Sequence, residues 1–110
     1  MTLLPSLLFV EDDLELAKLI GDFLARNGFD VRHIDRGDEV EAAVAAAPPD
    51  IILLDIMLPG KDGLSICRDL RPSFTAPIIL LTSVGSDMNQ ILGLELGAND
   101  YVVKTTPPAV

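Results

Sequence analysis

The chain has 110 residues, which fits one compact domain with a single hydrophobic core. Hydrophobic residues make up 49% of it and charged residues 23%, a balance typical of globular proteins and too apolar for a disordered chain. The net charge of −9 argues against binding of nucleic acid by this domain, because a phosphate backbone attracts Lys and Arg, and it favours binding of cations.

Five short apolar runs predict β-strands, which alternate along the chain with amphipathic segments. The predicted strands are 7–10, 31–34, 51–55, 77–82 and 100–104. Three of these runs are almost continuously apolar, as strands buried on both faces of a parallel sheet should be.

The amphipathic segments predict four helices, over 14–25, 38–47, 63–71 and 87–96. Asn27-Gly28 ends the first, because glycine accepts the left-handed conformation that a helix end often needs. Pro48-Pro49 stops the second, and Gly97 ends the fourth. Asp62 is a candidate N-cap for the third, and Asp13 is expected in the first turn of the first, where the helix dipole favours it.

Repeated strand–helix alternation predicts an α/β fold with a doubly wound parallel sheet. Right-handed crossovers and one reversal of winding give five strands in the flavodoxin-like (CheY-like) order 2-1-3-4-5, with helices on both faces. Ligands bind such sheets at the carboxyl ends of the strands, where the order reverses. That point lies between the first and third strands.

Polar and charged residues directly follow the first predicted strand or end the third, fourth and fifth, so they lie at this edge. They are Glu11 and Asp12, Asp55, Thr82 and Lys104. Acids gathered at one edge repel each other unless a cation holds them, and oxygen ligands suit Mg²⁺ first, although Mn²⁺ would also fit. A metal, an ammonium and a hydroxyl together stabilise a phosphoryl group, and Asp55 is the oxygen donor that could receive one.

These residues resemble those of the response-regulator receiver domain, the phosphorylated part of bacterial two-component systems. The resemblance covers residues 7–106 and is carried by the acidic pair, "DIMLPGKDG" around Asp55, "LLTS" around Thr82 and "DYVVK" at 100–104. The Glu-Asp form of the pair and "LLDIMLPGKDG" are similar to OmpR/PhoB-type transcription factors in particular.

The resemblance implies the roles of the site residues. Asp55 accepts the phosphoryl group from a sensor histidine kinase. Asp12 and Asp55 ligate Mg²⁺, Glu11 acts through water, and the backbone carbonyl of Met57 completes the protein ligands. No enzyme activity is implied beyond slow self-phosphorylation and dephosphorylation. Since the side chains of Met57 and Val84 would flank the phosphoryl group and cannot orient water, we expect dephosphorylation to be slow.

The resemblance also implies how the signal leaves the site. Lys104 pairs with the carboxylate or phosphate, Thr82 moves onto a phosphate oxygen, and Tyr101 rotates inward behind it. The fourth helix and fifth strand then change their outer face, which drives dimerisation. In full-length relatives that dimer positions a C-terminal DNA-binding domain.

Two departures from the family pattern qualify these expectations. The family has proline after the lysine, joined by a cis bond, whereas Thr105 follows Lys104 here, and a cis bond before a non-proline residue costs about 3–4 kcal/mol. We therefore expect a trans bond and an altered entry of the lysine into the site. The chain also stops at Val110, so we expect a receiver domain over 1–110 that lacks its fifth helix and the DNA-binding domain.

Other functions remain open from the residues alone. A Mg²⁺-dependent aspartyl phosphatase would need an acid two residues after Asp55, where Met57 stands. A flavin-binding protein would need a phosphate-binding loop after the first strand, where the acids repel phosphate. A degenerate receiver, acting as an interaction module without phosphorylation, stays open because of Thr105.

The remaining residues point to a soluble protein of a reducing compartment. Cys67 is the only cysteine and cannot form an internal disulfide, and we expect it to be buried. His33 is the only histidine and is given a structural or surface role. No signal peptide opens the chain and no apolar stretch is long enough to cross a bilayer, so we expect a cytoplasmic protein without membrane contact.

Overall fold

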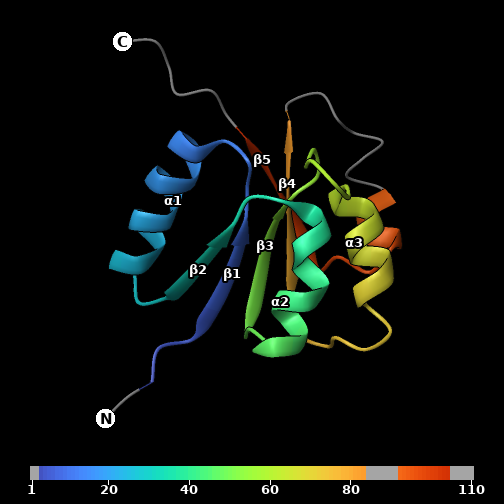
Figure 1. The fold of residues 1–110 in the computed structure, drawn as a ribbon, viewed down its shortest axis with the longest axis horizontal. Coiled ribbons are helices and arrows are strands. Elements are labelled where there is room, and N and C mark those ends of the chain that lie inside the picture. Colours follow the sequence, from blue (N-terminus) through green and yellow to red (C-terminus); the bar gives the residue numbers. More distant parts are fainter. Residues whose placement is uncertain (1–2, 84–91, 105–110) are drawn as a thin grey trace.

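The computed structural model describes residues 3–83 and 92–104, which form one parallel sheet flanked by helices (Figure 1). The strand order is β2-β1-β3-β4-β5, with every pair of neighbours parallel, so the predicted topology is confirmed. The elements are β1 (Ser6–Val10), α1 (Leu14–Arg26), β2 (Asp30–Ile34), the 3-10 turn η1 (Gly37–Glu39), α2 (Val40–Ala46), β3 (Ile51–Asp55), α3 (Gly63–Leu70), β4 (Ile78–Ser83) and β5 (Asp100–Lys104).

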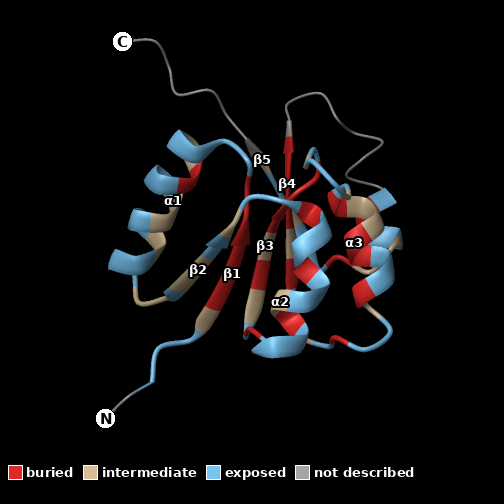
Figure 2. Cartoon of the chain, in the orientation of Figure 1, coloured by how far each residue is buried: buried red, intermediate tan, exposed pale blue. Residues whose placement is uncertain are grey.

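Alternate residues of the central strands face two separate hydrophobic cores. Leu8 of β1, with Ile52 and Leu54 of β3, packs beneath α2 and α3, where Cys67 is fully buried as expected. Leu7 and Phe9 of β1 face the other way, toward α1. Figure 2 shows the resulting pattern, with buried strands in the middle and exposed outer faces on the helices. Burial of the sheet on both sides explains why its strands read as continuous apolar runs.

Helix ends lie where local chemistry predicts them. The side chain of Asp13 accepts a hydrogen bond from the Leu16 N–H at 3.1 Å, so Asp13 is the N-cap of α1 and precedes the first turn instead of lying in it. Asp62 caps α3 in the same way through the Ser65 N–H at 2.9 Å. Gly28, with φ of +96°, follows α1 in the left-handed region as predicted.

The second helix differs from its prediction. The segment expected as one helix over 38–47 begins with the 3-10 turn η1, and α2 starts only at Val40. The backbone N–H of Gly37 donates to the Pro59 carbonyl at 3.0 Å, which ties the start of the segment to the loop after β3. This hydrogen bond fixes the backbone at Gly37, and the tighter 3-10 turn accommodates it before α2 begins.

The fourth predicted helix lies only partly within the described residues. Residues 92–95 are helical, and Gly97, with φ of +114°, follows them. Residues 87–91 and the Lys104–Thr105 bond lie outside the described residues, so the predicted start of that helix and the trans bond stay predictions.

Arg71, just after α3, holds the start of β4 and β5 together. Its guanidinium donates to the carbonyls of Gly97, Phe74 and Ala76 at 2.7–2.9 Å and to the side-chain oxygen of Asn99 at 2.8 Å. That same Asn99 oxygen accepts the backbone N–H of Ile78 at 2.9 Å. The several N–H donors of this one planar group therefore hold together the amino ends of β4 and β5, at the edge of the sheet opposite the carboxyl ends of the strands.

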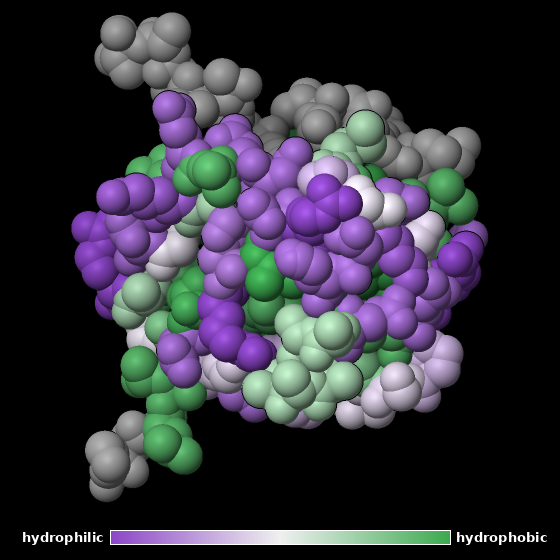
Figure 3. All heavy atoms as spheres, viewed as in Figure 1, coloured by the Kyte–Doolittle hydropathy of each residue, from purple (hydrophilic) through white to green (hydrophobic). Residues whose placement is uncertain are grey.

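The described surface is largely hydrophilic on the side seen in Figure 3, with apolar spheres gathered near the N-terminal end of the chain, where Leu3 and Leu4 are exposed. Leu19 and Phe23 of α1 and Val102 of β5 are also at least half exposed. Of the helices within the described ranges, none has the length and hydrophobicity to span a bilayer.

Candidate functional site

Three carboxylates meet at the carboxyl edge of the sheet, toward which all strand arrows point (Figure 1). Glu11 and Asp12 directly follow β1, and Asp55 is the last residue of the neighbouring strand β3. One oxygen from each lies within 4.8 Å of the others. Glu11 and Asp55 are almost fully buried, whereas Asp12 is exposed. We call these three residues the acidic cluster.

The backbone after β1 carries Glu11 and Asp12 into position. The Glu11 N–H donates to the Ile34 carbonyl at 3.1 Å, which extends the contact with β2 by one bond beyond the strand. The carboxylate of Glu11 accepts the Asp13 N–H at 3.2 Å, and Asp13 begins α1 as its N-cap. The two acids are thus held between the end of a strand and the start of a helix.

The loop after Asp55 is packed closely against Asp55 itself. The Met57 N–H donates to Asp55 Oδ1 at 3.3 Å, and the Gly63 N–H donates to the Ile56 carbonyl at 2.8 Å. A Cβ on Gly63 would come within 2.3 Å of the Asp55 carbonyl oxygen, so only glycine fits there. The Met57 side chain is 70% exposed and points away from the core.

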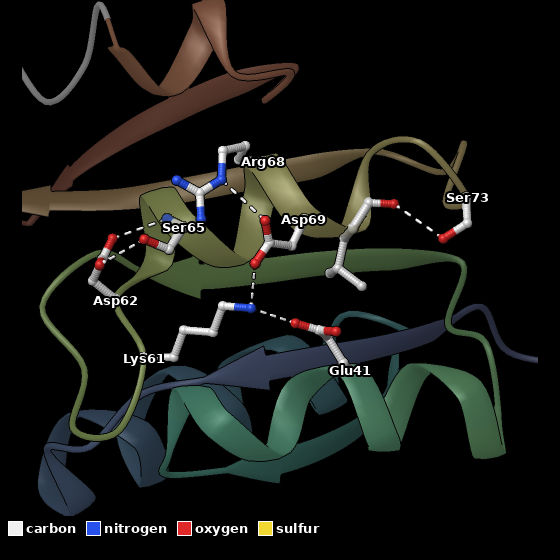
Figure 4. A network of polar contacts seen from close by, with 8 residues as sticks. Glu41, Lys61, Asp62, Ser65, Arg68, Asp69 and Ser73 are labelled. Atoms are coloured by element: carbon white, nitrogen blue, oxygen red, sulfur yellow. Dashed lines mark hydrogen bonds and ion pairs between the residues drawn. The ribbon is translucent and has the colours of Figure 1, made fainter.

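Lys61 connects this loop to two helices (Figure 4). Its ammonium forms ion pairs with Glu41 of α2 and Asp69 of α3, and Asp69 also pairs with Arg68. These pairs hold the pKa of Lys61 above its usual value, through Asp69 first and Glu41 second. No sequence signal predicts this network, because Glu41, Lys61 and Asp69 lie on three separate segments.

The ion pairs predict how stability depends on pH. Hydrogen bonds from Arg68 and Lys61 lower the pKa of Asp69 from 3.8 to about 2. A lowered folded-state pKa adds stability above the unfolded value, and that stability is lost as pH falls through about 2. Asp69→Asn should therefore melt below the unchanged protein at pH 6, with the gap closing between pH 4 and pH 2 in circular dichroism melts.

Two comparisons make this pH prediction specific. Added salt should narrow the gap at pH 6, because the pairs are partly exposed. Asp22→Asn, which neutralises an exposed acid of α1 outside this network, should melt close to the unchanged protein at pH 6. A constant difference for Asp69→Asn at every pH would contradict the assignment.

By strand register, Thr82 and Lys104 lie at the same edge, whereas Tyr101 lies near the start of β5. Thr82 follows Leu81, the partner of Asp55 on β4, and is 1% exposed. Lys104 ends β5 opposite Ser83, and its side chain lies outside the described residues. Tyr101 is half-buried and packs against the core under α2 and α3. Val84 lies outside the described residues.

The donor set of the acidic cluster fits a hard divalent cation. All three donors are carboxylate oxygens, and carboxylates held this close repel strongly in the absence of a counter-charge. Among the described residues, the single histidine and the buried Cys67 are not part of the cluster. The cluster can therefore hold a metal ion through oxygen ligands, as expected from the sequence.

Comparisons with known proteins agree with this arrangement. The chain matches the response regulator receiver domain family over residues 7–110. It is 56% identical over 105 residues to the transcriptional regulatory protein RstA of Escherichia coli and 42% identical over 104 residues to BaeR of Escherichia coli O6:H1. These alignments cover 96% and 94% of the chain but 44% and 43% of the relatives, so the chain spans less than half their length.

A solved structure shows the same fold. The BeF3-activated N-terminal receiver domain of RstA from Klebsiella pneumoniae superposes with a TM-score of 0.87 at 55% identity, covering 94% of this chain and 88% of that one. The match to an RstA-like, OmpR/PhoB-type regulator agrees with the resemblance inferred from the motifs, and it points to a regulatory domain and not a metabolic enzyme. The chain therefore belongs to the response regulator receiver domain family.

Proposed function

We propose that this domain is a phosphorylation-dependent switch whose phosphoryl acceptor is Asp55. The observation that carries the proposal is the acidic cluster at the ends of β1 and β3, with buried Thr82 on the adjacent strand. An isolated acid after a strand is ordinary. The carboxylate of Asp55, however, lies close enough to two other carboxylates for all three to bind one metal ion, which suits metal-assisted phosphoryl transfer.

The proposed reaction moves a phosphoryl group from a histidine of a sensor kinase to Asp55. A carboxylate oxygen of Asp55 attacks phosphorus, the bond from phosphorus to the imidazole nitrogen breaks, and the imidazole leaves. The product is an acyl phosphate on Asp55, and this modification is the proposed signal. The hydroxyl of Thr82 would donate a hydrogen bond to a phosphate oxygen, and Lys104 would supply a positive charge.

Mg²⁺ is the proposed cofactor, and Mn²⁺ would also fit the ligands. Asp12 and Asp55 would bind it directly, Glu11 through water, and Met57 through its backbone carbonyl. When bound, the ion neutralises charge on the phosphoryl oxygens and relieves repulsion within the acidic cluster. The exposed position of Asp12 and the near-complete burial of the other two acids support an ion that enters from solvent.

The proposed output is an altered surface on the fourth helix and β5. Thr82 and Tyr101 couple the phosphorylated site to that surface, which drives dimerisation with a second copy. In a full-length regulator the dimer would position a DNA-binding domain that lies beyond residues 1–110, so this domain itself would not contact DNA. We place such a regulator in the cytoplasm, where its kinase partner would present the phosphohistidine.

Incubation with acetyl phosphate and Mg²⁺ tests the acceptor directly. Intact mass spectrometry should show one phosphoryl adduct per chain, which disappears with EDTA and with Asp55→Asn. The amide has nearly the same shape but is a poor nucleophile, so the adduct should be lost without loss of the fold. Asp22→Asn is the matched control and should still accept one group.

Two results would contradict the proposal. An adduct on Asp55→Asn would place the acceptor elsewhere. No adduct on the unchanged protein, despite Mg²⁺ binding, would favour a degenerate receiver that acts as an interaction module without phosphorylation.

The phosphorylated form should lose its phosphoryl group slowly. Met57 contacts the proposed acceptor through its backbone N–H, and its thioether side chain is a poor group for orienting an attacking water. We expect a half-life well beyond seconds after acetyl phosphate is removed, measured by intact mass over time. Met57→Asn adds an amide that can hold water, so its adduct should decay faster; complete decay of the unchanged protein within seconds would contradict this.

A further inference from the structure

His33 on the edge strand β2 makes a hydrogen bond that has no role in the function proposed above. Its Nε2 lies 2.7 Å from the backbone carbonyl oxygen of Glu11. A carbonyl oxygen can only accept a hydrogen bond, so Nε2 must carry the proton and donate it. The bond joins two residues that lie 22 positions apart in sequence, at the point where β1 ends and the acidic cluster begins.

The imidazole is itself held in place by a neighbour on β1. His33 is the register partner of Phe9, and the two rings lie with centroids 5.9 Å apart at an interplanar angle of 55°. Because Phe9 is fully buried, its ring is held in place and the imidazole packs against it. The ring of His33 is thus restrained on one side by packing and at its tip by a hydrogen bond.

The contact controls a peptide plane that matters for the metal ligands. The Glu11 carbonyl and the Asp12 N–H belong to one planar peptide unit, so fixing the carbonyl fixes the backbone direction at Asp12. Asp12 is exposed and has little side-chain packing to hold its carboxylate near the two buried ones. Like charges push the three carboxylates apart, so a backbone that resists this force helps to keep Asp12 close to the other two.

The location of β2 explains why a side chain serves this purpose. β2 is the outer strand of the sheet and ends at Ile34, whose carbonyl accepts the Glu11 N–H. Beyond that bond the chain turns away toward η1. The imidazole of His33 continues the contact between the two segments by one further hydrogen bond, on the side of the sheet that faces α1.

We propose that His33 is a positioning residue for the acidic cluster, which holds the Glu11–Asp12 peptide so that Asp12 meets Asp55 at metal-binding distance. The inference rests on the proposed function, because it assigns His33 a part in binding the divalent cation. His33 does not ligate the ion and does not exchange the phosphoryl group. Groups that orient metal ligands in this way typically contribute about 10- to 100-fold in affinity.

Titration of the unphosphorylated domain with Mg²⁺ alone tests the proposal. The dissociation constant, measured by calorimetry, should rise about 10-fold in His33→Phe, which keeps a ring beside Phe9 but has no N–H donor. His33→Gln keeps a donor and should recover part of the affinity. The groove of about 340 Å³ between α1 and β2, which His33 lines, leaves room for either side chain.

Arg32→Met is the matched control on the same strand. The Arg32 guanidinium donates to the Ala47 carbonyl at 2.6 Å, away from the acidic cluster, so this change removes a hydrogen bond of β2 without touching Glu11. Its Mg²⁺ affinity should equal that of the unchanged protein. The amide resonance of Asp12 in metal-free protein should shift in His33→Phe and not in Arg32→Met.

Each outcome decides one question. Equal affinity of His33→Phe and the unchanged protein would overturn the positioning role and leave the proposed function standing. An equal loss in Arg32→Met would also overturn it, because damage to β2 would then explain the effect. Absence of Mg²⁺ binding by the unchanged protein would overturn both. If His33→Phe does not fold, His33→Ala, which introduces no new ring, takes its place in the same titration.

Discussion

Gly63→Ala is expected to destabilise the domain by about 2–3 kcal/mol and to disturb Asp55, the proposed phosphoryl acceptor, at the same time. A Cβ at this position would lie 2.3 Å from the Asp55 carbonyl oxygen and 2.8 Å from the Ile56 Cα, which are both backbone atoms. No side-chain rotation can relieve such an overlap. The start of α3 would have to move away from β3, and the loop that donates to Asp55 would move with it.

Gly21→Ala provides the opposite control. Gly21 lies inside α1, and a Cβ there would meet nothing within 4 Å. Alanine should therefore stabilise the helix by about 0.5–1 kcal/mol, because glycine loses more backbone entropy on folding. Chemical denaturation of both variants measures the contrast. A Gly63→Ala protein as stable as the unchanged one would show that the loop can retreat without cost.

The fold and the acidic cluster could be predicted because both follow from the regular alternation of strands and helices along the chain. Parallel strands all end at one edge, so residues at or directly after the ends of predicted strands must gather there, whatever their distance in sequence. Glu11, Asp12, Asp55 and Thr82 follow this rule. The motifs then limited the chemistry to a receiver domain, and the family match agrees.

The contacts that hold the site could not be predicted in the same way. The pairing of Lys61 with Glu41 and Asp69 depends on how closely α2 and α3 approach the loop after β3, which hydrophobic periodicity does not determine. The η1 turn depends on a hydrogen bond from Gly37 to a residue more than twenty positions later. The sequence predicts only a structural or surface role for His33, because its bond to Glu11 depends on one side-chain rotamer.

Asp12→Asn is expected to raise the stability of the metal-free domain and to weaken Mg²⁺ binding. Without an ion, the Asp12 carboxylate lies within 4.8 Å of two other carboxylates, and removing its charge relieves that repulsion. Because Asp12 is exposed, the gain should not exceed about 1 kcal/mol, the size of a unit-charge contact in water. Because Asp12 is a proposed direct ligand, its loss should raise the Mg²⁺ dissociation constant by at least about 10-fold.

Asp13→Asn is the matched control for this change, because it removes one negative charge from the next residue. Asparagine caps helices about as well as aspartate, so α1 should keep its N-terminus and both measurements should stay close to those of the unchanged protein. Melting in EDTA and in Mg²⁺ separates the two effects of Asp12→Asn. The unchanged protein should gain stability from Mg²⁺, whereas the Asp12→Asn protein should start higher and gain little. If the Asp12→Asn protein is less stable than the unchanged protein in EDTA, Asp12 supports the fold through contacts other than charge. Repulsion among the three carboxylates would then not destabilise the metal-free domain.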